Sequence, residues 1–328
     1  MISVILCTRN RCAPLQRALS TVAGLSFGQG CKWELIVVDN GSTDFTKEVV
    51  ETFAAGSRLD IRYVFEGRKG LSHARNAGIG QARGEIIAFI DDDMVLQADW
   101  LEAIARESSA RPDVSMFFGQ TRAMRPELAK LSVKEDAAEK TYVFPSDPGE
   151  PGCGNNMMLR KETFAKVGEF DVALGAGSTI GSSEDTDYTY RVLRAGGLVA
   201  YCPSILAYHD HDRVSSEKIR RLLFDYGRGR GGFYGKHILK GDGWAVKNCF
   251  WEVQCFCRKL LRKDETIRAF LHLIGMSIGF SLWIAFKSKE FVFGSLRRTK
   301  APGTTQALPQ VVRYMSEGSK QPPAGRAL

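Results

Sequence analysis

The stretch that most constrains the fold is residues 86–95, in which five apolar residues lead directly into three consecutive acids. The run Ile86–Ile90 is rich in branched side chains, which is typical of a strand buried on both faces of a parallel sheet. The carboxylates of Asp91, Asp92 and Asp93 would repel one another and lose hydration unless a positive partner lies beside them. A divalent cation carrying a phosphate is such a partner, because Mg²⁺ and Mn²⁺ bind a few carboxylates together with substrate oxygens. The alternative is a solvated acidic turn that caps the helix expected to begin near Ala98.

Strand-like and helix-like segments alternate through the first part of the chain. Buried strands are expected over residues 4–6, 33–39, 61–65 and 86–93, with helices over 14–24 and 46–54 and a loop and helix within 70–80. This alternation predicts a doubly wound α/β sheet. Ligands bind such sheets beyond the carboxyl ends of the strands, so we expect Thr8, Asp39 and the three acids to gather at one edge.

Glycine patterns argue against one large class of α/β enzymes. No glycine fingerprint follows the first strand, as a nicotinamide or flavin dehydrogenase would require. A GxGxxG match does occur at residues 227–232. It follows a helical pattern over 217–226 rather than a strand, so the match lacks the structural context that the motif needs.

Charge is distributed unevenly along the 328 residues. From Ser204 to the end there are 22 Lys and Arg against 10 Asp and Glu, whereas the preceding part has 23 against 27. A basic C-terminal third predicts an anionic partner, either a membrane or a nucleic acid. The Arg, Gly and aromatic run at 226–234 could bind single-stranded RNA. A flexible basic loop over phosphates or an anionic acceptor explains the run equally well, and we do not expect nucleic acid as a partner.

The cysteines and the first residues indicate the compartment. Eight cysteines show no CxxC pair and no zinc-like spacing, so we expect reduced thiols in a cytoplasmic protein. The sequence begins with the strand-like run Ile2–Leu6, without a basic region or a cleavage site. We therefore expect no signal peptide.

Six motifs in one order resemble family 2 glycosyltransferases of the GT-A fold. They are Val38–Asp44, Ala74–Gly78, Ala88–Asp93, Gly154–Asn156, Gly168–Asp171 and Glu184–Asp187. The resemblance covers about residues 1–212. It implies a doubly wound mixed sheet flanked by helices, and inverting transfer from a nucleotide-diphospho-sugar with the help of a divalent metal. The motifs are specific for the family but not for the sugar or the nucleotide.

Apart from the strand-end acids, the resemblance assigns five residues to the donor. Thr8 and Arg9 would line the nucleotide pocket, and Asp39 would contact the base or the ribose. Arg75 lies where a basic side chain approaches the diphosphate in the family, although a solvated helix cation is the alternative. Asn155, in a tight glycine turn into a strand, would flank the donor sugar.

The resemblance also implies a site for Mn²⁺ or Mg²⁺. Asp91 would face the ribose and the metal, and Asp93 would bind the metal. Asp92 is ranked below Asp91 and Asp93 as a donor-binding residue, because its position varies in the family. His209 matches a position at which some relatives bind the metal or the diphosphate, with His211 as its rival. A packed histidine without a ligand is the alternative.

The motif Glu184–Asp187 would supply the catalytic base. Inversion needs a carboxylate that takes the proton of the acceptor hydroxyl as this hydroxyl attacks the anomeric carbon. We predict Asp185 for this role, with Glu184 orienting the acceptor or serving as the reserve candidate, and Asp187 as a structural residue. Alternatively, acids in the first turn simply favour the helix dipole, with Ser182 or Ser183 as the cap.

The rest of the chain divides into three expected segments. Residues 213–243 form a basic Gly/Arg-rich extension, 244–300 an apolar and basic helical segment, and 301–328 a disordered tail. Residues 269–286 contain no acid, Lys or Arg. This uncharged run of 18 residues is at the short end for a membrane span. Gly275 and Gly279 permit close helix packing. We favour membrane association of this C-terminal helical, membrane-proximal extension over an ordinary buried helix, and leave open whether it spans.

Together these features predict a metal-dependent inverting glycosyltransferase at the cytoplasmic, inner face of the cell membrane. Its donor would be a nucleotide-diphospho-sugar, and its acceptor a lipid-linked or growing surface polysaccharide. A nucleotidyltransferase would also use strand-end acids and a metal, but it gives no role to the Glu184–Asp187 motif. The remaining alternative is a basic RNA- or membrane-binding protein whose sheet is only a scaffold.

Overall fold

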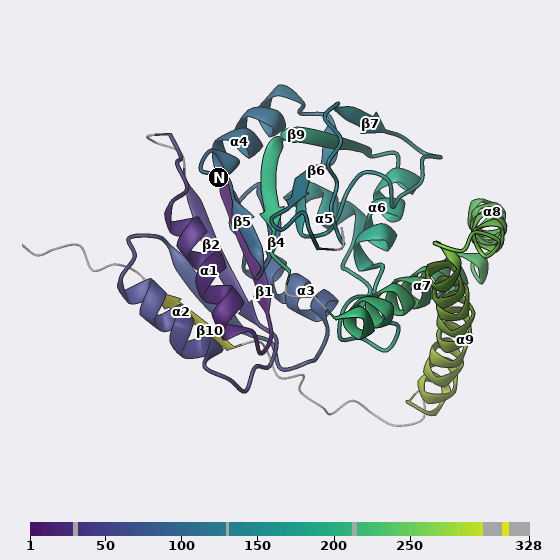
Figure 1. Cartoon of the computed structure of the whole chain (residues 1–328). Coiled ribbons are helices and arrows are strands. Elements are labelled where there is room, and N and C mark those ends of the chain that lie inside the picture. The colour runs from purple at the N-terminus through teal and green to yellow at the C-terminus, as the bar shows by residue number, and fades with distance from the viewer. Residues whose placement is uncertain (29–31, 129–130, 212–214, 298–309, 315–328) are drawn as a thin grey trace, which may run out of the picture.

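The computed structural model describes residues 1–28, 32–128, 131–211, 215–297 and 310–314 (Figure 1). Within these residues the chain forms one mixed β-sheet flanked by helices, with a group of C-terminal helices on one side. All cysteines in this part of the chain are free, as expected for reduced thiols.

The first half of the sheet is parallel and contains β1 (Ile2–Thr8), β2 (Trp33–Asp39), β3 (Ile61–Phe65) and β4 (Ile86–Asp91). The helices α1 (Cys12–Ala23), α2 (Thr46–Ala55) and α3 (Leu71–Gln81) connect these strands. Most residues of these strands are apolar and almost fully buried, because helices cover both faces of a parallel sheet. The predicted doubly wound sheet is therefore confirmed. The register pairs Thr8 with Asp39 and Cys7 with Asp91, so three strands end at one edge.

The second half of the sheet joins β4 through an antiparallel pair. It contains β5 (Met94–Leu96), β6 (Val114–Ala123), β7 (Lys140–Tyr142), β8 (Asn156–Arg160) and β9 (Leu198–His209). With β10 (Gln310–Tyr314), the strand order is β10-β3-β2-β1-β4-β8-β6-β9-β5, and β7 pairs with β9. The helices of this half are α4 (Trp100–Ala110), α5 (Lys161–Val167) and α6 (Glu184–Arg194).

Two buried apolar clusters hold the sheet between its helices. One includes Leu15 of α1 and Trp100 of α4, and the other includes Ala77 of α3 and Tyr188 of α6. Helices therefore pack on both faces, and the loops at the carboxyl edge are left to carry polar side chains.

Three further helices follow: α7 (Ser216–Ile238), α8 (Gly243–Lys259) and α9 (Thr266–Arg297). Figure 1 shows α7 between the α/β body and α9. Helix α7 continues through the Gly, Arg and aromatic run, so the expectation of a flexible basic loop at 226–234 is wrong.

Close packing explains why this glycine-rich run is helical. A Cβ atom on Gly231 would lie 1.9 Å from the carbonyl oxygen of Met276, and one on Gly279 would lie 1.8 Å from that of Arg228. The backbones of α7 and α9 therefore touch along a glycine seam, which we define as Gly227, Gly231, Gly275 and Gly279. The prediction that Gly275 and Gly279 permit close packing is confirmed, and the contact outweighs the low helix propensity of glycine.

Residues Thr266–Ser288 of α9 are long and apolar enough to cross a membrane, with a mean hydropathy of 1.8. Only 28% of the apolar window is buried inside the protein. Length and composition alone do not distinguish a span from a helix that lies on a surface.

Residues 310–314 belong to the segment expected to be disordered, and for these five residues the expectation is wrong. They form β10, which pairs antiparallel with β3. The outer side of β3 would otherwise present unpaired N–H and C=O groups, which favour the addition of a strand. The rest of the tail, like the expected boundary at residues 212–213, lies outside the described residues.

Candidate active site

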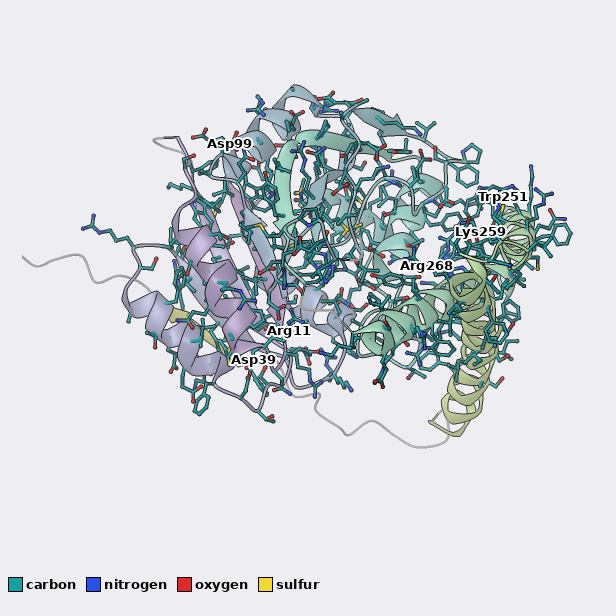
Figure 2. All side chains as sticks on the ribbon, viewed as in Figure 1. Arg11, Asp39, Asp99, Trp251, Lys259 and Arg268 are labelled. Carbon is teal, nitrogen blue, oxygen red and sulfur yellow. The ribbon has the colours of Figure 1, made fainter. Side chains whose placement is uncertain are left out.

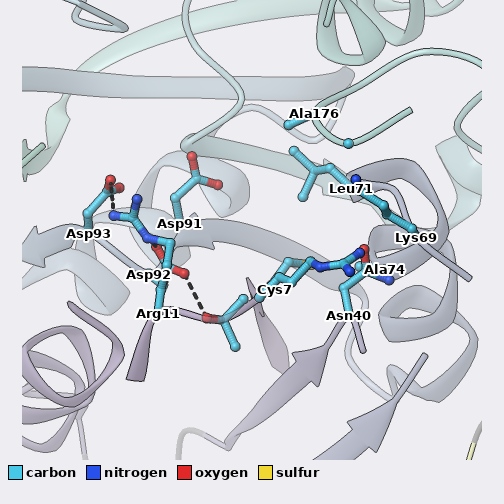
Figure 3. Close-up of a pocket in the computed structure, with 13 residues that line it drawn as sticks. Cys7, Arg11, Asn40, Lys69, Leu71, Ala74, Asp91, Asp92, Asp93 and Ala176 are labelled. Carbon is cyan, nitrogen blue, oxygen red and sulfur yellow. Dashed lines mark hydrogen bonds and ion pairs between the residues drawn. The ribbon is translucent and has the colours of Figure 1, made fainter. Parts of the chain in front are cut away.

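A cavity of about 280 Å³ opens at the carboxyl edge of the sheet, where β1, β2 and β4 end (Figure 3). Its lining comes from the strand ends, from the loops that follow them, from the start of α3 and from the loop before α6. The lining residues are Cys7, Thr8, Arg9, Arg11, Asn40, Lys69, Leu71, Ala74, Asp91, Asp92, Asp93, Ala176 and Gly177. The structure thus brings together five of the predicted site residues, namely Thr8, Arg9 and the three acids.

Arg11 is the principal partner of the acids and was given no role by the sequence. Its Nε lies 2.8 Å from Oδ1 of Asp92, and its Nη2 lies 2.7 Å from Oδ2 of Asp93. The hydroxyl of Thr8 donates a hydrogen bond of 2.7 Å to Oδ2 of Asp92. Figure 3 shows the contact between Arg11 and Asp93 as a dashed line, whereas no dashed line reaches Asp91. Adjacent parallel strands β1 and β4 place the loop of Arg11 beside the acids, which is the signal that could have identified it.

Burial makes the acids hard to ionise. It raises the pKa of Asp92 to about 7, with smaller contributions from the charges of Asp93 and Asp91, while Arg11 and Thr8 act in the opposite direction. Burial also raises the pKa of Asp91, opposed mainly by the charge of Arg75. A further cation near these groups would therefore stabilise their ionised forms.

His209 contacts the acids from the end of β9. Its Nε2 lies 3.3 Å from Oδ1 of Asp93, and its Nδ1 lies 2.9 Å from the carbonyl oxygen of Leu131. Burial lowers the pKa of His209, but the hydrogen bond and charge of Asp93 raise it more, so the net pKa is above its ordinary value. The rival His211 packs against the His209 ring, with ring centroids 5.3 Å apart.

The donor atoms suit a divalent cation that arrives with its ligand. Within the described residues, no three His, Cys, Asp or Glu side chains converge as a ready-made metal site. Oxygen donors such as Asp91 and Asp93 are nevertheless the kind that Mg²⁺ and Mn²⁺ prefer, and these ions often bind one or two carboxylates together with substrate phosphates. The residues present therefore fit a metal shared with a diphosphate, rather than a closed protein cage.

Asp39 and Asn40 have separate roles at the end of β2. Both oxygens of Asp39 accept hydrogen bonds of 2.7 Å, from the N–H of Ser42 and from the hydroxyl of Tyr63. Asp39 is buried and is outside the described lining of the cavity. Asn40 does line the cavity, and its side chain accepts a hydrogen bond from the N–H of Gly70. Contact of Asp39 with a nucleotide stays a prediction.

Arg75 is almost completely buried and is outside the described lining of the cavity. Its Nη1 donates to Oε1 of Glu184 at 2.8 Å, and its Nη2 donates to the carbonyl oxygen of Gly154 at 2.9 Å. Burial lowers its pKa, but the charges of Glu184, Asp91 and Asp185 raise it more. One buried cation thus lies close enough to influence both the strand-end acids and the acids of α6.

The two predicted catalytic acids have different surroundings. Burial and the charge of Asp185 raise the pKa of Glu184 to about 7, although its ion pair with Arg75 opposes the shift. Oδ2 of Asp185 accepts a hydrogen bond of 2.9 Å from the N–H of Gly154, and its Oδ1 accepts one of 2.7 Å from the N–H of Thr186. Both acids lie outside the described lining of the cavity. Arg75 already binds Glu184, whereas backbone donors orient the half-buried Asp185.

Gly154 joins these two acids at the turn before β8. Its carbonyl oxygen binds Arg75 and its N–H binds Asp185, and an added Cβ would lie only 2.9 Å from the Arg75 guanidinium. A glycine at this position thus leaves room for the Arg75 guanidinium. The neighbouring Asn155 is buried, and its side-chain amide donates to the carbonyl oxygen of Ser132 at 3.1 Å.

The first turn of α6 is held by α7. Ser183 occupies the N-cap position with a positive φ of 70°, but its side chain caps no backbone N–H, and Ser182 instead donates to the carbonyl oxygen of Asp225. The predicted serine cap is therefore wrong. Asp187 contacts Lys236 at 2.8 Å and His237 at 2.9 Å. Burial raises the pKa of Asp187, but the charge of Lys236, the hydrogen bond with His237 and the charge of Arg191 bring it well below the ordinary range.

The chain is similar to known proteins in sequence and in fold. A sequence model described as glycosyl transferase family 2 matches residues 3–168. The succinoglycan biosynthesis protein ExoM of Rhizobium meliloti is 25% identical over 285 residues, which are 83% of this chain and 90% of that protein. The glycosyltransferase AglE of Haloferax volcanii is 28% identical over 63% of this chain and 66% of its own length.

Solved structures share the fold at low sequence identity. The mannosyltransferase PcManGT from Pyrobaculum calidifontis, in complex with GDP-Man and Mn²⁺, has a TM-score of 0.59 and 17% identity, over 86% of this chain and 87% of that chain. S. aureus TarS 1–349 in complex with UDP-GlcNAc has a TM-score of 0.51 and 16% identity, over 89% of this chain and 92% of that chain. At these identities the likeness concerns the fold alone.

Proposed function

Because the chain belongs to glycosyl transferase family 2 and is a glycosyltransferase, we propose that it is metal-dependent and inverts the transferred sugar. The donor is a nucleotide-diphospho-sugar, and the acceptor is a hydroxyl of a lipid-linked or growing polysaccharide. The observation that carries this proposal is the grouping of Thr8, Arg11 and the three acids in one cavity, connected through buried Arg75 to the acids of α6.

The donor binds in the cavity. Thr8, Arg9, Asn40 and Lys69 are the polar lining residues available to a nucleotide and its phosphates. Asp91 and Asp93 would hold the Mn²⁺ or Mg²⁺, with His209 beside Asp93. When bound, the metal supplies positive charge that stabilises the departing nucleoside diphosphate. The GDP-Man and Mn²⁺ bound to PcManGT, and the UDP-GlcNAc bound to TarS, support this class of donor.

The chain's own cations supply fixed charge around the donor. Arg11 lies 2.7 Å from Asp93 and keeps a guanidinium beside the acids. Preorganised charges of this kind stabilise the charge that develops on a leaving group without any proton transfer. Arg75 acts from within the protein, by fixing Glu184 and the backbone of Gly154.

Asp185 acts as the general base. The acceptor hydroxyl attacks the anomeric carbon from the face opposite the diphosphate and forms the new glycosidic bond. The bond from the anomeric carbon to the diphosphate oxygen breaks, and the hydroxyl proton moves to the carboxylate of Asp185. The N–H groups of Gly154 and Thr186 orient this carboxylate, whereas Glu184 is engaged by Arg75.

The acceptor is placed at the cytoplasmic, inner face of the cell membrane. ExoM, a relative across nine tenths of its own length, is named as a succinoglycan biosynthesis protein. The basic C-terminal third is suited to an anionic membrane surface.

The first test is a thermal-shift panel of UDP, GDP, dTDP and CDP, each with Mn²⁺, Mg²⁺ or EDTA. A ligand at a hundredfold excess over its Kd stabilises the folded state by about 2.7 kcal/mol, so the correct nucleotide should give a clear, EDTA-sensitive shift. Absence of a shift with all four nucleotides on folded protein would refute the donor assignment.

The second test separates the base from the binding site. Asp185→Asn should lower kcat by about 10²- to 10⁴-fold while the nucleotide-induced shift is retained. Asp99→Asn is the matched control, because Asp99 precedes α4 on a different part of the molecule from Arg11 (Figure 2). An NMR assignment of the product's anomeric configuration tests inversion, and an Asp185→Asn enzyme with normal kcat would exclude this residue as the base.

A further inference from the structure

Helices α8 and α9 expose a series of large apolar side chains. Phe250 and Trp251 of α8 are 65% and 58% exposed. On α9, Ile267, Phe270 and Ile274 follow one another at spacings of three and four residues, with Phe270 54% exposed. Such spacing places side chains on one face of a helix. We call the exposed residues Phe250, Trp251, Ile267, Phe270, Ile274 and Ile278 the apolar stripe.

The opposite face of α9 is attached to the protein. Gly275 and Gly279 lie in the glycine seam with α7, and Met276 and Trp283 are buried beside them. Backbone contact at the seam holds α9 against α7 over several turns. Helix α9 therefore cannot move into a bilayer without taking α7 with it.

Charged groups make α7 unsuited to the interior of a bilayer. Arg230 of α7 forms a buried ion pair with Glu252 of α8, and Glu252 also contacts His272 of α9 at 2.8 Å. Six residues further along α7, Lys236 is bound to Asp187 of the catalytic helix α6. Charged side chains at the centre of a bilayer are costly, and this network also ties the three helices to the α/β body.

Exposed basic side chains occur on the same two helices as the apolar stripe. Residues 243–288 contain seven Lys and Arg but only three Asp and Glu, of which Glu252 is buried. Arg258, Arg262 and Arg268 are exposed near the turn between α8 and α9. Figure 2 shows Trp251, Lys259 and Arg268 together on the side of the molecule away from Asp39. Apolar and basic side chains in this combination match a bilayer surface with anionic head groups.

We propose that α8 and α9 lie in the plane of an anionic lipid surface and do not cross it. The apolar stripe enters the outer part of the acyl region, and the basic residues contact the lipid phosphates. Helix α7 stays above the head groups and connects the docked helices to α6. This inference specifies the membrane contact of the proposed function, but vesicle binding needs neither donor nor acceptor and is therefore measured independently of transfer.

Vesicle binding of the full chain tests the surface. We expect binding to vesicles that contain phosphatidylglycerol, and at least about tenfold weaker binding to phosphatidylcholine vesicles. The double variant Phe250→Glu and Trp251→Glu should lose about tenfold or more in partitioning, because two large side chains no longer leave water. Phe45→Glu is the matched control, since Phe45 is 72% exposed at the start of α2, outside the stripe.

Depth measurement distinguishes a helix in the plane from a span. Brominated lipids quench tryptophan fluorescence, and bromines placed near the head group or near the chain end report shallow or deep positions. In a Trp251→Phe background, Ile278→Trp adds a probe midway along Thr266–Ser288. The background protein keeps Trp33, Trp100, Trp244 and Trp283, so the difference in quenching between the two proteins reports the depth of residue 278. We expect stronger quenching from the shallow bromines. Stronger quenching from the deep bromines would overturn the in-plane orientation in favour of a span.

Two other outcomes would overturn the docking surface itself. One is equal binding of the Phe250→Glu and Trp251→Glu variant and the wild type to anionic vesicles. The other is absence of vesicle binding together with a dimer in solution that this variant dissociates, which would assign the stripe to a second copy of the chain. A nucleotide-induced thermal shift that persists in either case would leave the proposed transferase function intact.

Discussion

The glycine seam between α7 and α9 allows a stability effect to be worked out from one added methyl group. In Gly279→Ala, the new Cβ would lie 1.8 Å from the carbonyl oxygen of Arg228 and 2.9 Å from the nitrogen of Gly232. Non-bonded heavy atoms rest about 3.5 Å apart, so the two helices must separate by roughly 1.5 Å. Both atoms belong to the backbone of α7, and no flexible side chain can move aside.

Two opposing terms set the magnitude. Overpacking of a tight contact costs up to about 3 kcal/mol. Alanine recovers about 1 kcal/mol relative to glycine through its higher helix propensity. The free energy of unfolding should therefore fall by about 2 kcal/mol in Gly279→Ala, with Tm lower by about 3 °C for a chain of this size.

Thermal and urea unfolding followed by circular dichroism measure this change, and Gly80→Ala provides the control. Gly80 lies in α3, and an added Cβ there meets no heavy atom within 4 Å. Its substitution should raise stability by about 0.5–1 kcal/mol, because only the propensity term remains. If Gly279→Ala stabilised the protein as much as Gly80→Ala, the inferred backbone contact between α7 and α9 would be refuted.

Three further predictions concern the site. Arg75→Lys keeps the buried charge but loses one of the two hydrogen bonds, to Glu184 and to Gly154. The free energy of unfolding should therefore fall by about 1–3 kcal/mol in denaturant titrations. An unchanged free energy of unfolding would contradict these two contacts. Burial raises the pKa of Glu184 to about 7, so the folded protein keeps a proton that the unfolded chain releases near its ordinary value of 4.5. The proton therefore contributes up to about 3 kcal/mol to the free energy of unfolding below pH 4.5, and this contribution is lost as the pH rises to about 7. In urea unfolding, Glu184→Gln should not show this loss of stability between pH 4.5 and 7. Tyr63→Phe removes the hydroxyl that donates to Asp39 and should cost about 1–2 kcal/mol in urea unfolding, whereas a neutral effect would imply that water replaces the hydroxyl.

The edge of the sheet that holds the cavity could be predicted from sequence because the pattern there is strong. Apolar runs of strand length, alternating with helical segments, indicate parallel strands, and parallel strands end at one edge. This reasoning placed Thr8 and the acids Asp91–Asp93 together, as the structure does. It did not identify Arg11, because the partner of a buried acid depends on which strands are neighbours, here β1 and β4, and not on sequence distance.

Tertiary contacts decided the features that the sequence did not yield. The run at 226–234 has a composition typical of a loop, yet it is helical because its glycines allow backbone contact with α9. Arg75 resembles a solvated helix cation, but the fold buries it against Glu184. Ser183 has the residue type of a helix cap, but its positive φ and the attachment of Ser182 to α7 prevent that role. In each case a distant segment overrides the local preference.

The pairing of β10 with β3 affects whether copies of this protein associate through the edge of the sheet. Without residues 310–314, β3 would present a free row of N–H and C=O groups to which a strand of another molecule could add. β10 covers that row, and it is a short strand whose Arg313 pairs with Asp60 at 3.3 Å. A short, charged edge discourages further strand addition. We therefore expect β10 to disfavour self-association. A chain truncated at residue 297 should aggregate even though its cavity is complete.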